Sequence, residues 1–141
     1  VLGGLCEILQ TLPRNNMYRQ FYQDLFITLS ERIVQLQGKD GYWHASLLDP
    51  DSYPSPETSA TGFIVYALAY GVNEGLLDKT AFMPVIEKGW KALVKAVEKD
   101  GKLGYVQPIG ADPKKVTREM TEVYGVGAFL LAGNQIYKMA E

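Results

Sequence analysis

The side chains best suited to chemistry in this sequence of 141 residues gather in one loop that precedes a long apolar run. The loop contains Trp43, His44, Asp49, Asp51, Tyr53 and Glu57. An imidazole and several carboxylates can accept, donate or orient protons near neutral pH, and an indole can stack on the face of a sugar ring. A loop of this composition that leads into a buried helix predicts a binding or catalytic site.

Each of these loop residues also has a purely structural interpretation. Trp43 either stacks on a ligand or packs at the base of its loop, and His44 is either an acid/base group or a hydrogen-bonded structural histidine. Asp49 and Asp51 flank Pro50, and in such a turn an aspartate often bonds to the local backbone. We take Trp43 and His44 as candidate substrate-binding residues, with both interpretations open.

Glu57 stands immediately before a run, 58–73, that contains no charged residue and no histidine. A carboxylate in this place predicts a helix N-cap, which the helix dipole stabilises by about 0.3 to 1 kcal/mol. The functional alternative is that Glu57, Thr58 and Ser59 line the entrance of a pocket and meet a substrate.

Arg118 occupies the comparable place before the last apolar run, close to Glu119 and Glu122. Its planar guanidinium suits bidentate binding of a carboxylate, so Arg118 is the candidate for recognition of an acidic sugar. The alternative is an ion pair with a nearby acid. Tyr105 and Gln107 in the preceding loop carry the same ambiguity.

Hydrophobic periodicity predicts an all-α chain of about five helices that would position these residues. We expect helices at 1–12, 16–37, 58–76, 80–98 and 122–139. Asn15 or Asn16 is expected to cap the second helix, and Thr80 the fourth. No strand pattern exceeds a short hairpin at 42–48 or 103–109.

Two kinds of helix alternate along the chain. The expected helices at 16–37 and 80–98 have one charged face, whereas those at 1–12, 58–76 and 122–139 are nearly free of charge and rich in Gly and Ala. Two concentric layers need such an alternation, since outer helices face solvent and inner helices are covered on most sides. We therefore predict outer and inner helices, with 58–73 more buried than 16–37.

A short repeat supports the same architecture. The triplet Lys39-Asp40-Gly41 recurs as Lys99-Asp100-Gly101, each time after a helix with a charged face and before a loop that contains proline. Recurrence at this spacing is typical of stacked helical hairpins. The sequence therefore predicts a single domain, 1–141, that forms part of an α/α toroid.

Composition excludes several classes of protein. The net charge of −2 and the pI near 5.5 provide no basic field for nucleic acid or an anionic membrane. The single cysteine, Cys6, cannot form an internal disulfide, and one histidine cannot build a Cys/His zinc cluster. No membrane span, signal peptide, phosphate-binding glycine loop, GxSxG or HExxH motif is visible. We expect no metal, cofactor, nucleic acid or membrane partner, and the compartment stays open between cytoplasm and periplasm.

The start of the chain carries its own expectation. Val1 opens an apolar, glycine-containing run with no polar cap before it. We expect from this that the sequence is the C-terminal part of a larger protein, and that the rest of the parent chain packs against it.

Three segments of the sequence resemble one family of enzymes. They are DGYWHASLLD with PETSATGFIVYALAYGVNEGLL, EVYGVGAFLLAGNQIYKM near the C-terminus, and VLGGLCEILQTLP at the start. They are similar to segments of the unsaturated uronyl and rhamnogalacturonyl hydrolases, glycoside hydrolase families 88 and 105, and closest to 105. The ETS-x-T element and the YGVGAFLLAG run are the most specific parts. The resemblance covers essentially the whole chain and implies an incomplete (α/α)6 toroid.

The resemblance also implies a reaction. These hydrolases remove an unsaturated uronic acid from the non-reducing end of oligosaccharides that polysaccharide lyases release. An aspartate protonates the C4=C5 double bond and activates water to add at C5, and the resulting hemiketal opens to release the sugar without a metal. The family's two central aspartates lie on earlier hairpins, so we assign no catalytic residue to this chain. We expect Trp43, His44, Glu57, Thr58 and Arg118 to contribute to substrate binding.

Two alternatives from other classes stay open. The run Gln37-Gly38-Lys39-Asp40-Gly41-Tyr42-Trp43 fits the Q-x-x-x-G-x-W pattern of terpene cyclases, which are also toroid enzymes. In that pattern Gln caps a helix end and Trp stacks against it. The third hypothesis is a helical-repeat binding module that holds a partner on its loops without catalysis.

Overall fold

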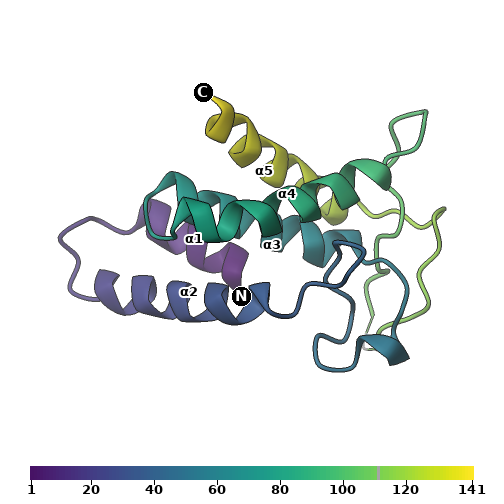
Figure 1. The fold of residues 1–141 in the computed structure, drawn as a ribbon, viewed down its shortest axis with the longest axis horizontal. Helices are drawn as coiled ribbons and strands as arrows, with labels where there is room; N and C mark the ends of the chain where they lie inside the picture. Colours follow the sequence, from purple (N-terminus) through teal and green to yellow (C-terminus); the bar gives the residue numbers. More distant parts are fainter. Residues whose placement is uncertain (111) are drawn as a thin grey trace.

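The computed structural model describes residues 1–110 and 112–141, and within them the chain is all-α (Figure 1). Its elements are α1 (Leu2–Thr11), α2 (Arg19–Val34), the 3₁₀ helix η1 (Pro50–Ser52), α3 (Thr58–Asn73), α4 (Lys79–Lys95) and α5 (Val123–Ala140). The predicted helices are confirmed. The described residues form no strand longer than the predicted limit of a short hairpin, since their β-pairing is an isolated bridge between Val97 and Leu103.

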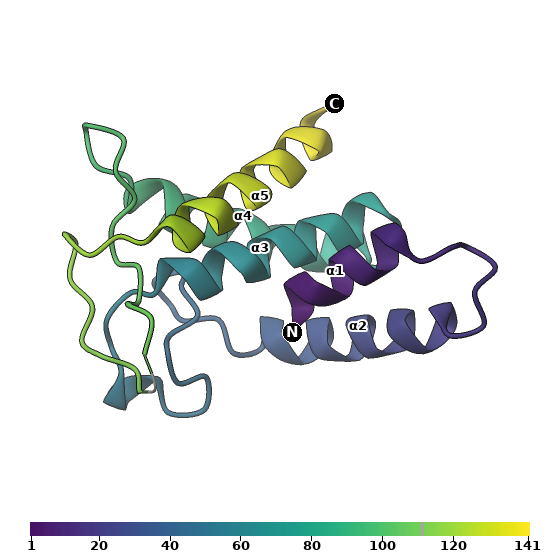
Figure 2. The same cartoon turned by 180° about the vertical axis from the view of Figure 1, so that it is seen from behind.

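Helix α3 lies at the centre of the arrangement. It contacts α1, α4 and α5, and α2 contacts α1. In Figure 2, α1, α3 and α5 run in one direction, while α2 and α4 run back. The two long loops, 35–57 and 96–122, therefore meet at the end of the molecule where α3 and α5 begin (Figures 1 and 2).

The central helix α3 is far more buried than α2, which has one charged face. Twelve of the sixteen residues of α3 are buried, against three of the sixteen in α2, which confirms the predicted order. Helix α5 packs mainly on α3 through a face of small residues, and its opposite face exposes Val123, Leu130 and Tyr137.

The repeated Lys-Asp-Gly triplet forms the same turn twice. In the first copy Gly38 N–H donates to Tyr42 O at 2.8 Å and Asp40 accepts from Tyr42 N–H at 3.2 Å. In the second copy Glu98 N–H donates to Lys102 O at 2.7 Å and Asp100 accepts from Lys102 N–H at 3.1 Å. Both glycines have the positive φ that the turn requires, 98° and 89°. The predicted repeat is confirmed.

The N-caps of α2 and α4 differ from those predicted. Helix α4 begins one residue earlier than expected, and Asp78 Oδ1 accepts from Ala81 N–H at 2.8 Å, so Asp78 is the cap and Thr80 is not. Asn16 accepts from Tyr18 N–H at 2.9 Å in a turn before α2, whose N-cap, Tyr18, makes no side-chain capping bond.

Asp78→Ala is expected to lower the free energy of unfolding by about 1 kcal/mol, because Ala81 N–H loses its acceptor. Thr80→Ala, the matched control inside the same helix, should change it by less than about 0.5 kcal/mol. Urea unfolding followed by circular dichroism measures both values. Equal losses in the two variants would contradict the capping role of Asp78.

Candidate functional site

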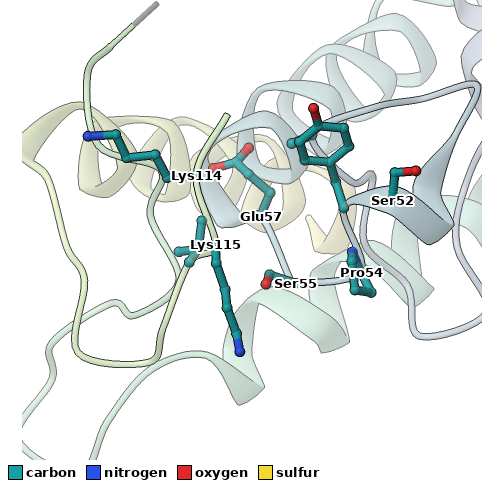
Figure 3. Close-up of a pocket in the computed structure, with 9 residues that line it drawn as sticks. Ser52, Pro54, Ser55, Glu57, Lys114 and Lys115 are labelled. Atoms are coloured by element: carbon teal, nitrogen blue, oxygen red, sulfur yellow. The ribbon is translucent and has the colours of Figure 1, made fainter. Parts of the chain in front are cut away.

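Two neighbouring pockets open where the long loops meet the N-termini of α3 and α5. The α3 pocket, of about 490 Å³, is lined by His44, Ala45, Leu47, Glu57, Ser59, Ala60, Ile64, Gln107, Pro108, Ile109, Gly110, Asp112, Pro113 and Tyr124. The Tyr53 pocket, of about 320 Å³, is lined by Ala45, Ser52, Tyr53, Pro54, Ser55, Glu57, Lys114, Lys115 and Val116 (Figure 3). Ala45 and Glu57 belong to both, so the pockets share one wall.

Glu57 is the centre of this shared wall. It is 4% exposed, and Oε1 accepts from Ser59 N–H at 3.1 Å, Ser59 Oγ–H at 2.7 Å and Gln107 N–H at 3.3 Å. Oε2 accepts from Ala60 N–H at 2.6 Å. The predicted N-cap is confirmed, and the same carboxylate also fixes the loop that carries Gln107.

His44 lines the α3 pocket with its ring between two acceptors. Nδ1 lies 3.0 Å from Ser55 O, and Nε2 lies 3.3 Å from the carboxylate of Asp40. Its side chain is 10% exposed. The histidine therefore ties the Lys-Asp-Gly turn to Ser55, in the segment that leads into α3.

Tyr124 and Gln107 complete the opposite wall. Tyr124 lies in the first turn of α5 and donates its hydroxyl to Gln107 O. Burial raises the pKa of Tyr124, and the neighbouring charge of Glu57 also raises it. The phenol therefore stays protonated and serves as a donor near neutral pH.

Trp43 does not reach either pocket, so its predicted role as a stacking platform is wrong. It is 0% exposed, its indole N–H donates to Ile33 O at 2.8 Å, and its backbone N–H donates to Thr61 Oγ1 at 3.1 Å. The ring lies against Gly89 of α4, where an added Cβ would lie 3.1 Å from the ring and 2.7 Å from Val65. Trp43 is a core residue that joins α2, α3 and α4.

The Q-x-x-x-G-x-W run also has a structural role. Gln37 Nε2 donates to Gly41 O at 3.1 Å and to Val85 O in α4 at 3.0 Å. Together with the Trp43 bond to Ile33 O, it fastens the end of α2 to α4.

Thr58 and Arg118 also lie outside the two pockets. Thr58 is 0% exposed and donates to Gly104 O at 2.8 Å, so it joins α3 to the second long loop. Arg118 is exposed and pairs with Glu98 beside the second Lys-Asp-Gly turn, as its structural interpretation predicted. The predicted substrate contact of Thr58 is wrong because its side chain is fully buried, whereas that of the exposed Arg118 stays a prediction. Asp49 and Asp51 line neither pocket.

Several pocket residues were not singled out from the sequence. Lys114 and Lys115 contribute to the Tyr53 pocket, and Figure 3 shows Glu57 between them and the turn that carries Ser52 and Pro54. Tyr124 belongs to the YGVGAFLLAG run, to which the sequence analysis gave no binding role. The feature that could have identified Tyr124 as a pocket residue is a polar aromatic side chain in the first turn of an otherwise apolar helix.

Other reactive groups lie away from the pockets. Cys6 is 0% exposed, and burial raises its pKa to about 12, so its thiol is not a nucleophile near neutral pH. Among the described residues, no group of three or more His, Cys, Asp and Glu side chains is placed to hold a metal ion. In the same part of the chain, every helix is too short or too polar to cross a bilayer. The pockets offer hydrogen-bonding groups suited to a polar organic ligand.

Comparison with known proteins identifies similar chains. One relative is an unsaturated 3S-rhamnoglycuronyl hydrolase of Formosa agariphila, 45% identical over 141 residues, which are 100% of this chain and 37% of that protein. A solved structure described as a polysaccharide lyase matches with a TM-score of 0.94 and 46% identity, over 99% of this chain and 41% of its own. A possible family 105 member from Salmonella enterica, 24% identical, matches with a TM-score of 0.80 over 100% of this chain and 38% of its own.

These matches concern a part of larger proteins, since the chain spans about 37% of the length of the curated relative above. The fold is that of the corresponding part of the α/α toroids of these glycoside hydrolases, with inner and outer helices in alternation. The profile of Glycosyl Hydrolase Family 88 matches residues 1–140. The family match also separates the chain from the terpene cyclases. The chain belongs to glycosyl hydrolase family 88.

Proposed function

We propose that the protein carrying this chain is a glycoside hydrolase that removes an unsaturated uronic acid from the non-reducing end of oligosaccharides released by polysaccharide lyases. The observation that carries the proposal is the 45% identity, over all 141 residues, to an unsaturated 3S-rhamnoglycuronyl hydrolase. The two pockets at the loop end support it, because they are adjacent, share a wall and have polar side chains in a largely apolar lining, as is usual for a small-molecule site.

The contribution of this chain is to bind and orient sugar. Tyr53 is 38% exposed beside the Tyr53 pocket, so its ring is available to pack on a sugar as Trp43 is not. His44, Ser59 and Tyr124 line the α3 pocket with polar side chains. A wall of this kind positions the hydroxyl groups of a bound sugar, and positioning contributes directly to rate.

Proton transfer is assigned to a residue outside this chain. Both carboxylate oxygens of Glu57 already accept hydrogen bonds from backbone or hydroxyl donors, so we give Glu57 a structural role. In the proposed reaction an aspartate delivers a proton to C4 while the oxygen of water bonds to C5. The hemiketal formed at C5 then opens, and the C–O bond to the next sugar breaks as that sugar leaves with a proton.

The ultraviolet absorbance of the conjugated C4=C5 double bond tests the proposal. Incubation of the full-length protein with an unsaturated glycuronyl-rhamnose disaccharide should make this absorbance fall, because hydration removes the conjugation. The likeness to a structure described as a polysaccharide lyase makes the opposite result informative. A lyase would create the double bond, so a rise in absorbance on intact polysaccharide, or no change on either substrate, would overturn the proposal.

A further inference from the structure

Gln107 uses all of its hydrogen-bonding groups to join three separate segments of the chain. Its backbone N–H donates to Glu57 Oε1 at 3.3 Å, and its backbone oxygen accepts from the hydroxyl of Tyr124. Its side-chain Nε2 donates to Lys114 O at 3.3 Å, and its Oε1 accepts from Lys114 N–H at 3.2 Å. The residue thus links the first turns of α3 and α5 to the segment that enters the Tyr53 pocket.

The two side-chain bonds close the base of a loop. The chain leaves Gln107 at Pro108 and returns through Pro113 to Lys114, and Pro108, Ile109, Gly110, Asp112 and Pro113 form one wall of the α3 pocket. Among the described residues, no backbone–backbone hydrogen bond involves this wall. The amide of Gln107 is therefore the polar contact that holds both ends of the loop together.

The next anchor along the chain lies beyond the loop. Val116 is 5% exposed and lines the Tyr53 pocket, so the segment after Lys114 is held by burial. Without the amide, the described part of the pocket wall would lose the polar contact that joins its two ends, and burial of Val116 would be the next anchor along the chain. If the wall also adopts a second arrangement that does not bind substrate, only a fraction of the molecules can bind at any moment. The apparent affinity for substrate is then reduced in proportion to that fraction.

We propose that Gln107 is a positioning residue for the carbohydrate site: its side-chain amide clamps the loop between Gln107 and Lys114 in the arrangement that binds substrate. The inference rests on the proposed function above and deepens it. Gln107 acts through the loop and takes no part in proton transfer, so it should influence substrate binding far more than the chemical step.

Gln107→Met keeps the length of the side chain and removes both amide bonds to Lys114. In the full-length protein, KM for the unsaturated disaccharide should rise about tenfold, with kcat within about twofold of the wild type. The matched control is Gln20→Met. Gln20 donates to Asp24 on the exposed side of α2, far along the chain from the pockets, so its loss should leave both constants unchanged.

Gln107→Glu provides a rescue that a merely structural role would not show. A protonated carboxyl group can accept from Lys114 N–H and donate to Lys114 O, as the amide does, whereas the ionised form sets a negative oxygen against that carbonyl. Glutamate ordinarily titrates at about pH 4.3. The ratio of KM in this variant to KM in the wild type should therefore fall toward one as pH is lowered from about 7 to about 4.

Hydrogen exchange of residues 112–116 provides a readout that does not use the reaction. Exchange should be faster in Gln107→Met than in the wild type and unchanged in Gln20→Met. Unchanged exchange in Gln107→Met, or faster exchange with an unchanged KM, overturns the positioning role and leaves the proposed function intact. A wild-type protein that turns over no unsaturated substrate overturns the proposed function together with this role.

Discussion

Trp43→Ala is expected to lower the free energy of unfolding by about 3 to 5 kcal/mol, the range for removal of a large buried aromatic side chain. The ring is 0% exposed between α2, α3 and α4, and its indole N–H satisfies Ile33 O at the end of α2. Truncation therefore leaves both a cavity and an unpaired buried carbonyl. Urea unfolding of the wild type and the variant measures the loss.

Two variants separate the contributions of volume and hydrogen bonding. Trp43→Phe fills most of the space but removes the donor to Ile33 O, so it should cost about 1 to 3 kcal/mol. Trp90→Ala serves as the comparison, because Trp90 is only partly buried and stacks on Phe129 at the edge of the core. At temperatures where Trp43→Phe stays folded, kcat/KM should match the wild type. A large fall in kcat/KM without a loss of stability would restore Trp43 as a substrate contact.

The helices could be predicted because their causes are local in sequence. The charge-free run 58–73 can form a stable helix only where neighbours cover it, and α3 is covered on most sides. The Lys-Asp-Gly triplets encode a turn that needs a positive φ at glycine and an aspartate acceptor two residues before the donor, and both copies form it. Composition and spacing carry this information without reference to distant residues.

The direction of side chains in the loops could not be predicted in the same way. The ring of Trp43 turns inward because Gly89, far along the chain in α4, leaves space for it. Arg118 meets Glu98 and Gln107 meets Lys114 across loops whose shape is not periodic. Of the candidate residues, Glu57 and His44 lie in the α3 pocket, and Glu57 was placed well because a helix cap is itself a local feature.

Glu57 and Glu122 form a natural pair of N-cap residues, since only one of them uses its side chain. Glu57 accepts four hydrogen bonds at the start of α3, whereas Glu122, the N-cap of α5, makes no side-chain capping bond. A larger loss in the free energy of unfolding on mutation of Glu57 than of Glu122 therefore measures the contribution of the buried carboxylate.

Glu57→Gln is expected to lower the free energy of unfolding by about 1 to 3 kcal/mol, and Glu57→Ala by about 2 to 4 kcal/mol. A glutamine whose oxygen faces Ser59 and Gln107 turns its amino group toward Ala60 N–H, which sets two donors against each other. Alanine leaves all four donors without their acceptor. Urea unfolding should show these losses, with less than about 0.5 kcal/mol for the control Glu122→Gln.

Kinetics then decide whether Glu57 also binds substrate. Because glutamine keeps the acceptor for Gln107 N–H, the loop that Gln107 clamps should stay in place, and kcat/KM of Glu57→Gln should remain within about threefold of the wild type. A tenfold to hundredfold fall, about 1.4 to 2.7 kcal/mol of transition-state binding, with unchanged stability would show a direct contact with the sugar instead. The expected result is the first, because both carboxylate oxygens of Glu57 already accept hydrogen bonds from its own chain.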